Sequence, residues 1–320
     1  MAFMKTVFMY AGQGSQHSGM GKDIYEKYPA YRRVLDRLEL DFDIKKLMHE
    51  GEAEVLAQTE YTQPCMAAFA AGVTEVLKER GIFPDAVCGL SLGEYGALFA
   101  AGVFSAEDYV GLTAFRGRAM ADAARGKTCS MSAVLGSTAA ETEEVCRRVN
   151  EQKEFGFVAL VNYNCPGQYV ICGDETAVAK AEALLKEMGV KRSIRLKVSG
   201  PFHTKYMSPA AERLAEKLAS VNFGKPKLPV VLNMTGDYYD GASCLKEYLC
   251  MQIQNSVRFE DSIARLLADG AERFIEIGPG NALAGFVKKT AKAYGKVVTV
   301  DTIDTAEQLD AVLETERERG

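Results

Sequence analysis

Histidine is scarce in this chain, and its scarcity limits the chemistry that we expect. The 320 residues include three histidines, His17, His49 and His203, and no Cys-x-x-Cys pair. Zinc and related ions need clusters of histidine, cysteine and carboxylate ligands, so we expect no metal site, and also no bound cofactor. The eight cysteines stand singly, mostly inside apolar runs such as 170–172, which is typical of buried free thiols in a reducing compartment.

The chain also lacks a long apolar segment and an excess of basic residues. No run approaches the length of a membrane span, and the apolar run at 7–11 is too short for a signal peptide. The formal net charge is −5 and the sequence pI is about 5.5, which argues against nucleic acid and membrane surfaces as partners. We expect a cytoplasmic protein that acts as a monomer.

The segment at 89–93, GLSLG, has the pattern Gly-x-Ser-x-Gly. It follows a short apolar run at 86–88 and precedes a helix-like stretch at 95–101. In this strand–turn–helix context the pattern is a nucleophile elbow, a tight turn that presents a serine hydroxyl at the top of a sheet. The N–H groups of the following helix favour negative charge that develops there. We therefore predict that Ser91 is a nucleophile.

Strand-like and helix-like segments alternate over most of the chain. We expect strands at 6–10, 86–88, 229–233, 272–276 and 296–300, and helices at 64–80, 92–101, 106–124, 207–220, 243–253, 258–268 and from 281 onward. This alternation predicts an α/β fold with a mostly parallel sheet and helices on both faces. Together with the elbow, it indicates a large α/β-hydrolase-like domain.

The middle of the chain has a different order of elements. We expect strand 130–135, helix 139–151, strands 157–163 and 168–172, helix 176–188 and strand 191–197. The order β-α-β-β-α-β is that of the ferredoxin-like split unit. We predict a ferredoxin-like small domain at 128–197, inserted into a catalytic domain formed by 1–127 and 198–320. A cleft between the two would be a usual place for a ligand.

A serine nucleophile requires a general base, and the histidines are the candidates. His49 lies in a polar helical segment, where we expect a solvated surface position, and His17 is expected at the rim of the cleft. His203 lies in a turn where the chain re-enters the large domain, and it follows Ser91 in the order typical of this fold class. No acidic residue between Ser91 and His203 stands out as a third triad member. Because a backbone carbonyl can hold the imidazole tautomer instead, we predict a Ser–His dyad.

Further motifs follow one another along the chain. They are GQGSQ at 12–16, YTQP at 61–64, GLSLGEY at 89–95, RG at 116–117, VNYNCPGQ at 161–168, GPFH at 200–203, NSVR at 255–258 and EIGPG at 276–280. In this order they resemble the malonyl-CoA:acyl carrier protein transacylase family of fatty acid and polyketide synthesis, from Thr6 to about Val287. The ordered set is far more specific than the elbow alone.

The resemblance implies a role for each matched position. Ser91 would accept the acyl group and His203 would be its base. The backbone N–H groups of Gln13 and Leu92 would form the oxyanion hole, and the carbonyl of Gln252 would orient the histidine.

Arg116 matches the arginine that pairs with the free carboxylate of the substrate. A planar guanidinium can bind a carboxylate through two parallel hydrogen bonds, which a lysine cannot do. Without the motif, Arg116 would be interpreted as a solvated helix arginine. Gln63, Asn162 and Phe202 lie in matched motifs and are the candidates for the acyl pocket.

Two positions depart from the commonest family pattern. Leu90 replaces a histidine that often precedes the serine, so any polar contact of that histidine is absent. Phe202 stands where some relatives carry serine. In related polyketide acyltransferases a phenylalanine here accompanies a preference for malonyl over methylmalonyl, because its ring fills the space of the α-methyl group.

The resemblance implies a ping-pong reaction with malonyl-CoA as substrate and CoA as product. Ser91 would take the malonyl group and pass it to the phosphopantetheine thiol of holo-acyl carrier protein. Carrier proteins are acidic, and the candidate basic patch for docking is formed by Lys191, Arg192, Arg195 and Lys197.

Three alternatives stay open at this point. A serine thioesterase or esterase would use the same elbow, although Arg116 and the missing acidic residue argue against it. A non-catalytic scaffold is disfavoured because Ser91, His203 and Arg116 are intact. A freestanding polyketide-synthase acyltransferase would carry the same residues, so the chain does not distinguish it.

Overall fold

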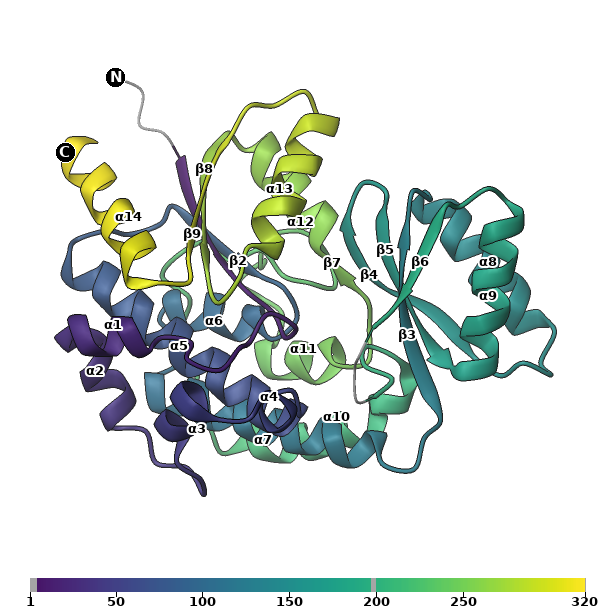
Figure 1. Cartoon of the computed structure of the whole chain (residues 1–320), viewed down its shortest axis with the longest axis horizontal. Coiled ribbons are helices and arrows are strands. Elements are labelled where there is room, and N and C mark those ends of the chain that lie inside the picture. The colour runs from purple at the N-terminus through teal and green to yellow at the C-terminus, as the bar shows by residue number, and fades with distance from the viewer. Residues whose placement is uncertain (1–4, 197–199, 320) are drawn as a thin grey trace.

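Two β-sheets organise the molecule, which we describe from a computed structural model (Figure 1). The structure describes residues 5–196 and 200–319. Within these residues, the first sheet has the strand order β2-β1-β8-β9 and the second has the order β6-β3-β5-β4-β7. The fold is therefore α/β, with one parallel and one mixed sheet.

The first sheet is parallel throughout. Its strands are β1 (Lys5–Tyr10), β2 (Ala86–Gly89), β8 (Ala271–Ile277) and β9 (Thr299–Ile303). β1, β2 and β8 are almost fully buried, which explains why they have nearly continuous apolar sequences. Because the carboxyl ends of parallel strands meet at one edge, the turns after Tyr10, Gly89 and Ile277 lie close together.

Helices cover both faces of the first sheet. On one face, α12 (Phe259–Ala268) and α13 (Ala282–Ala293) pack on Val7, Met9 and Phe274. On the other face, Phe8, Tyr10 and Ile275 belong to a large core shared with further helices. These helices include α5 (Thr59–Glu79), α6 (Gly93–Ala100), α7 (Ala106–Ala124), α10 (Ser208–Ala219), α11 (Leu245–Gln252) and α14 (Ala306–Arg319).

The second sheet is built mainly from the middle of the chain. Its strands are β3 (Cys129–Leu135), β4 (Val158–Cys165), β5 (Gln168–Asp174), β6 (Arg192–Arg195) and β7 (Val257–Arg258). The first four pair antiparallel, whereas β7 arrives from the later part of the chain and pairs parallel with β4. α8 (Ala139–Glu151) and α9 (Glu175–Glu187) cover its outer face (Figure 1).

Several elements differ from the sequence-based prediction. The strand predicted at 229–233 is wrong: Val230 forms an isolated bridge with Val87, and the chain then turns away. Pro229 supplies no N–H to a ladder, so pairing beside β2 is short. The helix predicted from Pro64 begins five residues earlier, at Thr59, and Pro64 lies inside it.

Short elements account for most of the unpredicted structure. The two-residue strand β7 precedes α12 where only a helix was predicted. Three short helices and a 3₁₀ turn also escaped prediction: α1 (Lys22–Lys27), α2 (Pro29–Asp36), α4 (Ala53–Leu56) and η1 (Lys205–Met207). The helical segment expected around His49 is α3 (Ile44–Glu50). The helices predicted at 106–124 and 139–151 are confirmed at those bounds.

None of the helices in the described ranges is both long and apolar enough to pass through a membrane. The eight cysteines are free thiols, most of them buried.

Candidate active site

The GLSLG segment forms a sharp turn between β2 and α6. Ser91 has a φ of 55°, in the left-handed region that residues with a side chain rarely adopt. A Cβ atom on Gly89 would collide with the backbone of Gly93, and one on Gly93 would collide with the carbonyl of Tyr10. The two glycines therefore allow the turn to pack against the end of β1, and this packing fixes where the serine hydroxyl lies.

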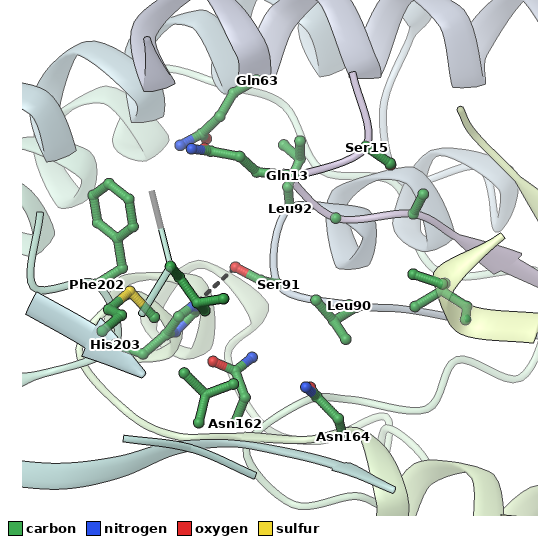
Figure 2. A pocket seen from close by; sticks show the side chains of 18 of the residues that line it. Gln13, Ser15, Gln63, Leu90, Ser91, Leu92, Asn162, Asn164, Phe202 and His203 are labelled. Carbon is green, nitrogen blue, oxygen red and sulfur yellow. Dashed lines mark hydrogen bonds between the residues drawn. The ribbon is translucent and has the colours of Figure 1, made fainter. Parts of the chain in front are cut away.

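A histidine from a distant part of the chain contacts this hydroxyl. The distance between Ser91 Oγ and His203 Nε2 is 2.6 Å, and the dashed line in Figure 2 marks this contact. On the other side of the ring, Nδ1 donates to two backbone carbonyls, that of Gln252 at 3.0 Å and that of Asn255 at 3.1 Å. These acceptors place the proton on Nδ1 and leave Nε2 free to accept the serine proton.

His203 is buried, and burial lowers its pKa to about 4. This pKa value includes a smaller lowering by the positive charge of Arg116 and the opposite effect of the two carbonyl acceptors. The imidazole is therefore neutral near pH 7, as a general base must be.

Arg116 lies in α7 and is almost completely buried, with 1% of its surface exposed. Its Nη1 donates to Gln63 Oε1 at 2.8 Å, and its Nη2 donates to Gln252 Oε1 at 3.1 Å and to Ser91 Oγ at 3.3 Å. All three acceptors are neutral, and burial lowers the pKa of the guanidinium. A buried cation without an anionic hydrogen-bond partner is well suited to bind the carboxylate of a ligand.

The backbone N–H groups of Gln13 and Leu92 have no hydrogen-bond partner among the described residues. The side chain of Gln13 accepts from Thr59 Oγ1 at 2.7 Å, so the residue offers the site its main chain. Both residues line the same cavity as Ser91. Two free N–H groups beside a nucleophile are what an oxyanion hole requires.

The cavity has a volume of about 450 Å³ and lies between the two sheets. Gln63, Asn162 and Phe202, the predicted pocket residues, all line it. Figure 2 shows Gln13 and Gln63 on one side of Ser91, and Asn162 and Asn164 on the other. The apolar part of the wall is formed by Leu90, Met120, Met131, Val170, Leu196, Leu283 and Phe286.

The other two histidines do not reach the dyad. His17 is exposed and lies 3.2 Å from Asp304 Oδ1, outside the cavity lining. The solvated position predicted for His49 is wrong: its ring is partly buried and packs edge-on against Tyr25, with 5.5 Å between ring centroids. Burial accordingly lowers the pKa of His49.

The predicted basic patch is only partly free. Lys191 and Arg192 are exposed at the β6 edge of the second sheet. Arg195 is also exposed, but its guanidinium pairs with Glu182 at 2.8 Å and donates to Ser130. Lys197 lies outside the described residues.

Sequence reasoning missed two residues that support the elbow from below. Asn233 Oδ1 accepts the Ser91 N–H at 2.6 Å, and its Nδ2 donates to the Gly89 carbonyl at 2.7 Å. Glu94 Oε1 accepts the Asn233 N–H at 2.6 Å, and burial raises the pKa of Glu94 to about 8. The available signal for Asn233 was its place at the end of the apolar run at 229–233, which was predicted to be a strand.

A third supporting contact comes from the side chain of Gln252. Its Nε2 donates to the Ser91 carbonyl at 2.8 Å, while its backbone carbonyl accepts from His203. One residue therefore contacts the nucleophile, the base and, through Oε1, the guanidinium. The resemblance had implied only the contact with the histidine.

A buried Ser–His pair, two free N–H groups and a guanidinium around one cavity define a serine-dependent acyl-transfer site. The family model described as acyl transferase domain matches residues 7–311. The chain is 42% identical to the malonyl CoA-acyl carrier protein transacylase of Bacillus subtilis, over 99% of each chain. It therefore belongs to the acyl transferase family and, within it, to the malonyl CoA-acyl carrier protein transacylases.

Solved structures agree with this assignment. The chain is similar to a crystal structure of MCAT from Streptococcus pneumoniae, with a TM-score of 0.90 and 41% identity over 97% of this chain and 100% of that one. It is also similar to a malonyl transacylase solved in complex with a type II polyketide synthase acyl carrier protein. In that comparison the TM-score is 0.91, with 32% identity over 97% of this chain and 99% of that one.

Proposed function

We propose that this chain moves a malonyl group from malonyl-CoA to the phosphopantetheine thiol of holo-acyl carrier protein, through an ester on Ser91. The observation that carries the proposal is that Ser91 Oγ lies between His203 Nε2 at 2.6 Å and Arg116 Nη2 at 3.3 Å. The name of the relative at 42% identity, and the solved transacylase–carrier complex, support the same donor and acceptor.

In the first half-reaction, Ser91 Oγ attacks the thioester carbonyl carbon while its proton passes to His203 Nε2. The carbonyl oxygen becomes an oxyanion, which the N–H groups of Gln13 and Leu92 bind. The carbon–sulfur bond then breaks, and the CoA sulfur takes the proton from His203. In the second half-reaction the carrier thiol gives its proton to His203 and attacks the ester, and Ser91 leaves with that proton.

Arg116 accounts for the choice of a short diacid. In a malonyl ester, one carbonyl carbon and one methylene separate the serine oxygen from the free carboxylate. The carboxylate of the bound group therefore stays near Oγ, where the guanidinium already lies. Binding it gives the buried cation an anionic partner and fixes the ester for the second attack.

The same geometry disfavours a serine hydrolase. Hydrolysis of a simple ester does not require a buried guanidinium beside the nucleophile. The histidine is also held by two backbone carbonyls and not by the acidic residue of a hydrolase triad. The carrier protein can be one of fatty acid synthesis or of a type II polyketide synthase, the latter suggested by the solved complex.

The finer description of the molecule belongs to the same proposal. The strand order β6-β3-β5-β4 and the β-α-β-β-α-β connectivity support a ferredoxin-like small domain at 128–197. The first sheet with its elbow supports an α/β-hydrolase-like domain formed by 1–127 and 198–320. A cytoplasmic location, a monomeric state and the absence of a bound cofactor stay predictions.

The decisive test is the replacement Ser91→Ala. Incubation with malonyl-CoA should add a malonyl group to the original chain, detected as an increase in intact mass, and should add none to the variant. His203→Ala, which keeps the hydroxyl, should load several orders of magnitude more slowly. A variant without Ser91 that still acquires the group would exclude the proposed nucleophile.

A further inference from the structure

The NSVR motif at 255–258 supplies no reacting group, yet its first residue contacts the base of the dyad. The carbonyl of Asn255 accepts from His203 Nδ1 at 3.1 Å, beside the Gln252 carbonyl at 3.0 Å. The next residues, Val257 and Arg258, are strand β7. Asn255, whose carbonyl is the second acceptor of the base, is therefore separated by one residue, Ser256, from the strand that joins the second sheet.

The Gln252 carbonyl is held independently of that sheet. It lies at the end of α11, and the carbonyl of the following residue, Ile253, accepts the backbone N–H of His203 at 3.1 Å. The end of this helix thus fixes both the main chain and the ring of His203. Carbonyls at a helix C-terminus carry partial negative charge, which stabilises an imidazolium.

Asn255 is held from two sides: its Nδ2 donates to the Met251 carbonyl of α11 at 2.8 Å, and the residue after it is bound to β4 of the second sheet. Ser256 Oγ donates to the carbonyl of Leu160 at 2.7 Å, and Val257 pairs opposite Asn162. The register of β4 against β5 shifts between Leu160 and Asn162. β4 pairs with β7 only at Asn162 and Tyr163, so Leu160 lies just before that pairing, and there its carbonyl accepts from the Ser256 hydroxyl.

β7 alone is a weak attachment, since it contributes two residues to the sheet. Val257 is fully buried, and the Arg258 N–H donates to the Asn233 carbonyl at 2.7 Å. The end of the turn at Arg258 is therefore fixed next to the elbow, which Asn233 also contacts. Ser256 lies between Asn255 and Val257 in the chain, and its hydroxyl binds this turn to β4 through the Leu160 carbonyl. Its loss would let the Asn255 carbonyl move relative to the ring.

We propose that Ser256 is a positioning residue for the base: by binding the Leu160 carbonyl, it makes strand β4 hold the second carbonyl acceptor of His203. This inference rests on the dyad of the proposed function. Strand β4, which carries Asn162 and Asn164 into the cavity, then also influences the stability of the protonated form of His203 during transfer.

The expected effect follows from the charge that forms on the ring. When His203 takes the serine proton, the imidazolium has two acceptors for its Nδ1 proton, and both stabilise it. Both hydrogen bonds act to raise the pKa of His203, against burial and against Arg116, the cation that faces the ring from α7. With a single acceptor left, the imidazolium is less stable and acylation is slower.

The experiment compares Ser256→Ala with Ser256→Thr, which keeps a hydroxyl. The probe is a fluorophosphonate, which phosphonylates a serine activated by histidine and needs no malonyl carboxylate, CoA or carrier protein. Ser220→Ala is the matched control, because Ser220 Oγ also donates to a backbone carbonyl, that of Lys217 at 2.8 Å, on an exposed helix end.

We expect Ser256→Ala to lower the second-order rate constant of Ser91 labelling about three- to tenfold, the effect of one lost neutral hydrogen bond. Ser256→Thr should stay within about twofold of the original chain, and Ser220→Ala should be unchanged. The malonyl-CoA KM should be unchanged while the loading rate constant falls in parallel with labelling. The number of labelled sites at the end of the reaction gives the concentration of folded, reactive protein, and each rate constant is calculated from that concentration.

Two outcomes would overturn the inference. One is an Ser256→Ala chain that is labelled as fast as the original. The other is equal slowing by alanine and threonine, which would mean that the hydroxyl is not what matters. If the original chain is labelled but transfers no malonyl, the proposed substrate fails and the labelling comparison still decides the role of Ser256.

Discussion

At the scale of single residues, Arg116 has the most unusual environment in the site. Its guanidinium is buried, its hydrogen-bond acceptors are neutral, and its Nε has no partner among the described residues. Burying a charge without a counter-ion costs several kcal/mol, which the three acceptors offset only in part. A carboxylate on the acyl group would offset the remaining cost, so the site favours an acyl group that carries one.

Replacing Arg116 should therefore change the choice of acyl group. We expect Arg116→Ala to lower malonyl transfer at least about tenfold and to raise acetyl transfer relative to it. The measurement is transfer from each acyl-CoA to a holo-acyl carrier protein. Arg118→Ala is the control, because Arg118 lies on the same helix but is exposed and pairs with Asp41. An equal loss for both acyl groups would contradict the carboxylate-binding role.

The low pKa of His203 predicts a broad pH range for acylation. The base is active when neutral, and burial with the nearby guanidinium disfavours the protonated form. Ser91 labelling by a fluorophosphonate should therefore stay level from pH 7 to about 5 and fall with a midpoint near pH 4. In Arg116→Ala a positive charge is removed, so the midpoint should move to higher pH. A midpoint near 6.5 in the original chain would contradict this explanation.

Residues recognised from the sequence are those whose side chains form a motif. Ser91 could be proposed from its own elbow pattern, whereas Arg116 was singled out only through the family resemblance, because by itself it would be interpreted as a solvated helix arginine. The Asn255 carbonyl could not be predicted, because every residue has one and only the fold decides where it points. The role of Asn233 could not be predicted for the same reason, since its side chain contacts the backbone of a turn far away in the sequence.

At the scale of elements, the elbow depends on close approach between β2, α6 and the end of β1. Gly93→Ala should push a methyl group into the Tyr10 carbonyl, slow Ser91 labelling by at least about tenfold and lower the free energy of unfolding by about 1–3 kcal/mol. Urea unfolding and labelling rates measure the two effects. Gly111→Ala is the control, because a Cβ at this helix position has no neighbour within 4 Å and should be neutral or slightly stabilising.

Most long elements followed from the sequence, apart from α14 (Ala306–Arg319), and most short ones did not. α7 has a serine cap, acidic residues in its first turn and a long helical pattern, so both of its ends could be predicted. β7 has two residues and no periodicity, and it exists because β4 offers an edge. The segment at 229–233 is apolar like a strand, yet a proline and the turn after it limit the pairing to a bridge.

At the scale of the whole molecule, the acidic chain has to receive a second, acidic protein. Lys191 and Arg192 are exposed at the edge of the second sheet, whereas Arg195 is already paired. Reversing both charges, with Lys191→Glu and Arg192→Glu together, should raise the KM for carrier protein about fivefold or more at low salt and leave malonyl loading unchanged. Lys296→Glu, in the exposed loop before β9, is the control. An unchanged KM would remove this patch as the docking site.

The course of the chain through the two sheets has a consequence for biosynthesis. Ser91 is translated before the strands β3 to β6, whereas His203 and the Asn255 carbonyl come after them. A nascent chain that has exposed Ser91 therefore still lacks the imidazole that contacts its hydroxyl and the carbonyls that hold that imidazole. A ribosome-bound fragment that ends before His203 has the hydroxyl without its base, and both carbonyl acceptors of the imidazole require the chain as far as Asn255.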